Sequence, residues 1–190
     1  DLMGLICGSE GLLGVITEVT AKILKKPQVV KAALIGFPSI EEGANATSEI
    51  LSNGIIPAGM EIMDKALIEA TDNFSKAGYP RDAELLLIVE VDGTESEVDI
   101  LLKDVSSICK KNNCSSLKLS QSEKERLSFW SGRKSAFPAC GAMAPDYYCM
   151  DGVIPRGKLA EALLEIKRLS EKYNLPVANC FHAGDGNLHP

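Results

Sequence analysis

The chain has 190 residues, 45% of them hydrophobic, enough to bury a sizeable core in one domain or in one domain with a piece of a second. Its 20 basic and 26 acidic residues give a net charge of −6, and the lack of a long basic cluster argues against a nucleic-acid partner. No apolar run approaches the roughly 20 residues of a membrane-spanning helix, and the start resembles neither a signal nor a transit peptide. Six cysteines without a Cys-x-x-Cys pair are typical of reduced thiols in a cytoplasmic protein.

The first 27 residues start at Asp1 without an initiator methionine, so we expect them to belong to a longer chain. Glycines at positions 8, 11 and 14 predict a loop whose backbone N–H groups can approach a ligand phosphate or ring edge. This spacing differs from the Gly-x-Gly-x-x-Gly of a Rossmann turn. A glycine-rich turn that leads into a strand at 15–23 is therefore an equally good interpretation.

Residues 28–120 alternate strand and helix patterns. Apolar, β-branched stretches predict the strands, and capping residues followed by acidic residues open the helices. The order β-α-β, then β-α-β with one extra helix between the halves, predicts an α+β fold: a ferredoxin-like antiparallel sheet with helices on one face. The predicted strands are 29–37, 58–63, 84–91 and 116–120, and the predicted helices are 38–51, 64–74 and 95–112.

The remaining residues extend this domain. We expect a helix at 121–137, a loop with two prolines at 137–147, a strand at 148–154, a helix at 155–173 and a strand at 177–181. The last of these strands leads directly into His182.

The final nine residues hold the only two histidines of the chain, His182 and His189, on either side of a Gly-Asp-Gly turn signal. If Asp185 and Gly186 form a two-residue hairpin loop, His182 pairs with His189. Directly opposed residues have Cβ atoms roughly 4.5–5.5 Å apart, which suits two imidazoles that bind one metal ion. Two ligands do not complete a metal site, and Cys180 on the same strand face is a weaker candidate.

Together these stretches resemble the FAD-linked oxidases of the vanillyl-alcohol oxidase type. Residues 8–18 are similar to the last flavin-contacting loop and strand of that family. The resemblance implies that residues 1–27 are the end of an FAD-binding domain and that 28–190 are a substrate (cap) domain, truncated before its C-terminal end. The substrate-domain motifs are Phe129-Trp130-x-x-Arg133-Lys134, the run from Asp146 to Pro155, and the run from His182 to Pro190. The implied flavin contacts are Gly8, Ser9, Glu10, Gly11, Gly14, Val15 and Ile16.

Two family segments are absent from this chain. One is the glycine-rich pyrophosphate loop that precedes the matching region, and the other is a downstream Glu-His-Gly segment that supplies a carboxylate metal ligand and a candidate base. We therefore expect the chain by itself neither to hold FAD tightly nor to turn over.

The reaction implied by the resemblance is oxidation of a 2-hydroxy acid, with FAD as hydride acceptor. Arg133 is the candidate that holds the carboxylate, because a guanidinium grips a carboxylate bidentately. His182 and His189 would bind a divalent metal (zinc, iron or manganese) that acidifies the hydroxyl. These three residues form the expected catalytic set, and Tyr148 and Asn187 join Arg133 as expected substrate contacts. A surface ion pair for Arg133 and purely structural histidines are the alternatives.

Glycolate is the expected substrate, and D-lactate is the runner-up because the same motifs serve both acids. Cys149 and Met150 stand where relatives that oxidise a dicarboxylic acid carry a lysine, which favours a smaller monocarboxylic substrate. Relatives that oxidise glycolate work with a second flavoprotein-like subunit and an iron-sulfur subunit, which implies a cytoplasmic protein, peripheral on the inner membrane face. A non-catalytic interaction module, whose histidines only staple a hairpin, is the alternative from another class.

Overall fold

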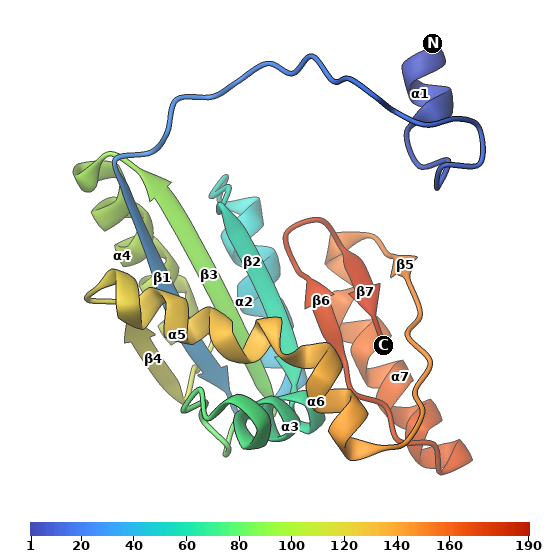
Figure 1. Cartoon of the computed structure of the whole chain (residues 1–190). Coiled ribbons are helices and arrows are strands. Elements are labelled where there is room, and N and C mark those ends of the chain that lie inside the picture. Colours follow the sequence, from blue (N-terminus) through green and yellow to red (C-terminus); the bar gives the residue numbers. More distant parts are fainter.

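A seven-stranded sheet forms the centre of the structure, and every pair of neighbouring strands in it is antiparallel (Figure 1). The computed structural model describes residues 1–190. The strand order is β4-β1-β3-β2-β6-β7-β5, and its first four strands have the order of a ferredoxin-like split βαβ sheet, which confirms the predicted α+β class. The strands are β1 (Val29–Phe37), β2 (Gly59–Asp64), β3 (Leu85–Gly93), β4 (Ser116–Leu119), β5 (Gly152–Val153), β6 (Cys180–His182) and β7 (Asn187–His189).

The helices begin where their capping residues predict. Ser39, Asp64, Thr94 and Ser122 each accept a hydrogen bond from a backbone N–H of the first turn, and Thr94 forms a full capping box with Glu97. No helix of the chain is both long and apolar enough to cross a membrane. The α-helices are α1 (Leu2–Ile6), α2 (Ile40–Ser52), α3 (Lys65–Ser75), α4 (Glu95–Lys111), α5 (Glu123–Lys134), α6 (Ala136–Met143) and α7 (Leu159–Tyr173), with a 3₁₀ turn at Arg156–Lys158.

Helices cover both faces of the sheet. Helices α2, α4 and α7 pack on one face around the larger core cluster, as predicted. The structure differs from the expected single layer because α3, α5 and α6 pack on the opposite face around a second cluster. The reason lies in β3, whose residues Leu85–Val89 are all fully buried. A strand with a continuous apolar run has apolar side chains on both faces of the sheet and needs helices on both, whereas a strand with alternating apolar and polar residues needs them on one face only.

Residues 1–27 lie outside this body. Figure 1 shows α1 and the chain that follows it extending away from the sheet, and almost every side chain up to Lys26 is exposed. The strand expected at 15–23 does not form. An isolated strand has no neighbour to satisfy its N–H and C=O groups, so its apolar pattern alone does not make it a strand.

Two further predictions need correction. The single helix expected at 121–137 is divided at Ser135 into α5 and α6, and α6 contains Pro138 in its first turn, where a missing N–H does no harm. The strand expected at 148–154 is reduced to Gly152–Val153, which pairs with β7. The expected strand 177–181 is shifted to Cys180–His182.

Gly43 of α2 provides a test of the packing between α2 and β3. A Cβ atom at this buried position would lie 2.5 Å from Cδ2 of Leu85, which is itself fully buried. We expect Gly43→Ala to lower the free energy of unfolding by about 1–3 kcal/mol, measured by urea denaturation, because the well-packed Leu85 cannot move aside. The control is Gly141→Ala in α6, where the nearest atom is 3.9 Å away; this variant should be neutral or more stable. Equal effects of both variants would contradict the packing.

Candidate functional site

The two histidines lie on neighbouring strands of one hairpin. The register pairs Cys180 with His189 and His182 with Asn187, so the predicted direct pairing of His182 with His189 is wrong. The loop is longer than two residues because the N–H groups of Asp185 and Gly186 both bond to the His182 carbonyl, at 3.3 and 3.1 Å. A shift of register by two residues leaves side chains on the same face. The imidazole rings therefore still meet, edge to face, with centroids 5.1 Å apart.

Glu61 of β2 ties His182 to the sheet. β2 pairs with β6 so that Glu61 stands directly opposite His182, and Glu61 Oε1 lies 2.7 Å from His182 Nδ1. An ionised carboxylate can only accept hydrogen bonds, so the Nδ1 atom carries the proton of this contact. The Nε2 lone pair of His182 is then free to bind a ligand.

Arg133 reaches the same carboxylate from the helical layer. It lies in the last turn of α5, and its Nε donates to Glu61 Oε2 at 2.8 Å. The side chains of Arg133 and Glu61 are only 14% and 11% exposed, so this ion pair is largely removed from water. The bond from Nε is the only side-chain hydrogen bond of Arg133 within the protein, which leaves its two terminal amino groups for another anion. The structure thus brings Arg133, Glu61, His182 and His189 together on one face of the sheet.

Asn187 and Asp185 take different roles. Asn187 stands opposite His182 in the hairpin, and its buried Oδ1 has no hydrogen-bond partner within the protein. Such an acceptor favours a role at the site. Asp185 Oδ1 accepts the N–H of Asn187 at 3.0 Å, the side-chain-to-backbone contact of an Asx turn, so Asp185 shapes the loop.

Other predicted site residues are not part of this cluster. Residues 8–16, predicted to contact flavin, lie in the exposed N-terminal segment away from the sheet (Figure 1). Within that segment Gly8, Glu10 and Gly11 adopt positive φ angles of 80°, 53° and 78°, and a Cβ at either glycine would meet no atom within 4 Å, so the loop backbone is open. Tyr148, a predicted substrate contact, is 85% exposed in the segment between α6 and β5.

Cys180 faces His189 in the hairpin and is 7% exposed. Burial raises the pKa of its thiol to about 12, with a smaller opposing effect from Arg133. The contribution of Cys180 is apolar packing beneath the histidines.

Glu61 is the functional residue that sequence reasoning missed. A signal was present: it is the one charged residue within the otherwise apolar stretch Met60–Met63, and charged groups are rarely buried without a partner. Its partners come from 72 and 121 residues further along the chain. No local pattern links positions so far apart.

The histidines form part of a metal site at most. No three His, Cys, Asp or Glu side chains of the chain come together as a metal-binding group. The two imidazoles supply two nitrogen donors, and the carboxylate on Nδ1 of His182 resembles the partner that orients a metal-bound histidine. Additional ligands would have to come from outside this chain.

Comparisons with known proteins identify relatives of this chain. The chain is 53% identical to glycolate oxidase subunit GlcD of Escherichia coli (strain K12) over 190 residues, which are all of this chain and 38% of that relative. It is 34% identical over 191 residues to the mitochondrial cytochrome D-lactate dehydrogenase of Arabidopsis thaliana, covering 33% of it. The chain therefore spans less than two-fifths of these relatives.

A solved structure and a family comparison agree on the fold. The alkyldihydroxyacetonephosphate synthase structure superimposes with a TM-score of 0.70 over all of this chain and 40% of that one, at 18% identity, which supports the fold alone. Residues 26–190 match the family of FAD linked oxidases, C-terminal domain. A match over most of the chain, with the same fold and strong identity to family members, means that this chain belongs to the FAD-linked oxidases and carries their C-terminal domain.

Proposed function

We propose that the chain is part of a flavin-dependent dehydrogenase or oxidase that converts a small 2-hydroxy acid, glycolate first, to the 2-oxo acid. Residues 28–190 are its substrate domain and residues 1–27 the end of its FAD-binding domain. The observation that carries the proposal is the cluster on β2, α5 and the β6-β7 hairpin. In this cluster the Glu61 carboxylate binds Arg133 through one oxygen and His182 through the other, and the ring of His182 lies against that of His189. The 53% sequence identity to GlcD, which extends over all 190 residues, supports this proposal.

Each residue of the cluster has a distinct task. The free terminal amino groups of Arg133 bind the carboxylate of the acid, and the ion pair with Glu61 holds the guanidinium plane in place. Bound FAD would supply the acceptor for the C2 hydride, and the proton of the 2-hydroxyl would pass to a base outside this chain, so that the two-electron oxidation balances. Asn187, opposite His182 in the hairpin, is the proposed contact for the hydroxyl side of the substrate.

His182 and His189 hold a divalent metal through nitrogen donors, with the remaining ligands from outside the chain. A bound metal would lower the pKa of the substrate hydroxyl and orient it together with the carboxylate. The contact of Glu61 with Nδ1 leaves the Nε2 lone pair of His182 as the donor that would bind the metal. Nitrogen donors with oxygen ligands suit zinc, iron or manganese.

The flavin is held mainly by protein outside this chain. The open backbone of residues 8–16, with positive φ at two glycines and no atom within 4 Å of a Cβ built on either, fits a loop that would lie against flavin once the binding domain surrounds it. Tyr148, which is exposed in this chain, would contact the substrate in the same assembled state.

D-lactate is the second candidate, favoured by the identity to the Arabidopsis enzyme. The name of the Escherichia coli relative describes a subunit of a larger oxidase. We therefore also propose an assembly with further subunits, a second flavoprotein-like subunit and an iron-sulfur subunit, at the cytoplasmic face of the membrane.

The full-length protein tests the function directly. Glycolate added anaerobically should bleach the flavin absorption band at a higher rate than D-lactate, because glycolate is the substrate proposed first. Reduction of the flavin needs only the bound acid and FAD. The measurement is stopped-flow absorbance with each acid in turn. Faster bleaching by D-lactate would name the second candidate, and a protein without flavin, or one that neither acid reduces, would leave the interaction module as the better account.

Metal content tests the histidine pair. The double variant His182→Ala/His189→Ala should purify with less than about a tenth of the wild-type metal, since losing two donors removes most of the site. Elemental analysis of the full-length protein measures this, with flavin content as the control for folding. Undiminished metal would contradict ligation by these residues.

The role of Glu61 can be tested without changing the two histidines. Glu61→Gln keeps the shape but removes the charge, and we expect the metal dissociation constant, measured by chelator competition, to rise about 10–100-fold, as for other orienting carboxylates. The matched control is Glu90→Gln in β3, because Glu90 is a similarly buried carboxylate that pairs with Arg126 and Trp130 instead. An equal loss of metal in both variants would mean that general destabilisation is the cause.

A further inference from the structure

Tyr79 lies in the loop between α3 and β3, and its hydroxyl group enters helix α5. Its O–H donates to the carbonyl of Phe129 at 2.5 Å and accepts the N–H of Arg133 at 3.0 Å. In an uninterrupted α-helix the N–H of a residue bonds the carbonyl four positions earlier, so these are the two groups that α5 would join directly. The phenol hydroxyl therefore bridges one rung of the helical ladder, immediately before the helix ends.

Gly132 makes this insertion possible. A Cβ atom at Gly132 would lie 2.3 Å from Cε2 and 2.6 Å from the hydroxyl oxygen of Tyr79. The aromatic ring thus occupies the space of the missing side chain. Tyr79 is only 4% exposed and Gly132 is buried, so the contact is part of the core beneath Arg133.

The contact between Tyr79 and Arg133 lies directly before the end of α5. After Arg133 the chain closes α5 with a tighter turn, in which the N–H of Ser135 bonds the carbonyl of Gly132 at 2.9 Å, and α6 begins at the next residue. The N–H of Arg133, immediately before this turn, is held by the Tyr79 hydroxyl. The backbone of Arg133, and with it the base of the guanidinium arm, is therefore set by a residue 54 positions earlier.

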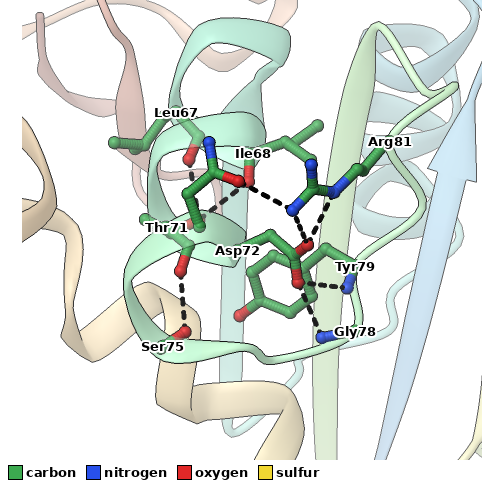
Figure 2. A network of polar contacts seen from close by, with 9 residues as sticks. Leu67, Ile68, Thr71, Asp72, Ser75, Gly78, Tyr79 and Arg81 are labelled. Carbon is green, nitrogen blue, oxygen red and sulfur yellow. Dashed lines mark hydrogen bonds and ion pairs between the residues drawn. The ribbon is translucent and has the colours of Figure 1, made fainter. Parts of the chain in front are cut away.

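Asp72 holds Tyr79 from the other side, as Figure 2 shows. Its carboxylate accepts the N–H groups of Gly78 and Tyr79 at 2.8 and 3.2 Å, and the Nε of Arg81 at 2.8 Å. Burial raises the pKa of Asp72, but the hydrogen bonds from Arg81 and from the two backbone groups outweigh it and hold the pKa below its usual value. The charged carboxylate thereby anchors the loop that carries Tyr79.

We propose that Tyr79 is a positioning residue for substrate binding: its hydroxyl, anchored through Asp72, sets the backbone of Arg133 so that the guanidinium meets both Glu61 and the carboxylate of the 2-hydroxy acid. The inference rests on the proposed function of Arg133. It adds a specificity-determining contact that lies outside the cluster and touches neither substrate nor flavin.

The test is Tyr79→Phe in the full-length flavoprotein. Anaerobic flavin reduction separates the apparent dissociation constant of the acid from the limiting rate of reduction. We expect the dissociation constant to rise about tenfold and the limiting rate to change less than about twofold, because ground-state carboxylate binding is weakened while the flavin is untouched. An unchanged dissociation constant overturns the proposal.

A double-mutant cycle shows whether Tyr79 acts through Arg133. Oxalate, which has the carboxylate but no C2 hydrogen, serves as probe, and its binding is read from the flavin spectrum. In an Arg133→Ala background, Tyr79→Phe should no longer weaken oxalate binding, since the group it positions is absent. A full additive loss in that background overturns the proposal.

Thr71→Val is the matched control for the loss of a buried hydroxyl. Thr71 is fully buried one residue before Asp72, and its hydroxyl donates to the Leu67 and Ile68 carbonyls without reaching Arg133 (Figure 2). The Thr71→Val variant should leave the dissociation constant of the acid unchanged. A rise equal to that of Tyr79→Phe would overturn the proposal.

A second variant covers the case in which Tyr79→Phe does not fold. Asp72→Asn keeps the phenol of Tyr79 and weakens the contacts that anchor its loop, so it should raise the dissociation constant of the acid by about threefold. An unchanged dissociation constant in this variant overturns the proposal. The proposed function fails separately: it is lost if neither acid reduces wild-type flavin. If wild-type flavin is reduced and the variants bind the acid normally, only the role of Tyr79 is lost.

Discussion

The carboxylate of Glu61 is the interaction on which the candidate site depends. A charge removed from water must be paired and hydrogen-bonded, or it destabilises the fold. Glu61 meets that demand with a guanidinium from α5 on one oxygen and an imidazole from β6 on the other. One buried group thereby joins the ferredoxin-like half of the domain to the hairpin added at its edge. The same contact orients the two side chains that have the chemistry to bind an acid and a metal.

The sheet topology brings these groups together. Strand β2 would be an edge strand in the four-stranded ferredoxin-like sheet, and here it pairs with β6, which closes that edge. The pairing aligns Glu61 with His182 and Met63 with Cys180, so the polar pair lies beside an apolar one on the same face. The second helical layer then brings the C-terminal end of α5 over this face. An arginine in the last turn is also favoured there by the helix dipole.

Several features could be predicted from the sequence because their causes are local. Ser39, Asp64 and Thr94 act within one helical turn, and β3 is recognisable from five consecutive apolar residues. The shared face of His182 and His189 also follows from local spacing, because a register error of two residues preserves the strand face. Their exact pairing does not follow, since it depends on how the loop before Asn187 uses its own hydrogen bonds.

The sequence by itself therefore determined the α+β class, the capped helices, the central strands and the shared face of His182 and His189, because these follow from short-range periodicity and side-chain type. Only the tertiary structure decided that Glu61 bridges Arg133 and His182, that Tyr79 enters the ladder of α5, and that residues 15–23 do not form a strand. The physical reason is common to all three. The stability of a buried charge, of a buried hydroxyl or of a single strand depends on the groups that it pairs with. Those partners are far away in the chain or absent from it, so the local sequence does not indicate them.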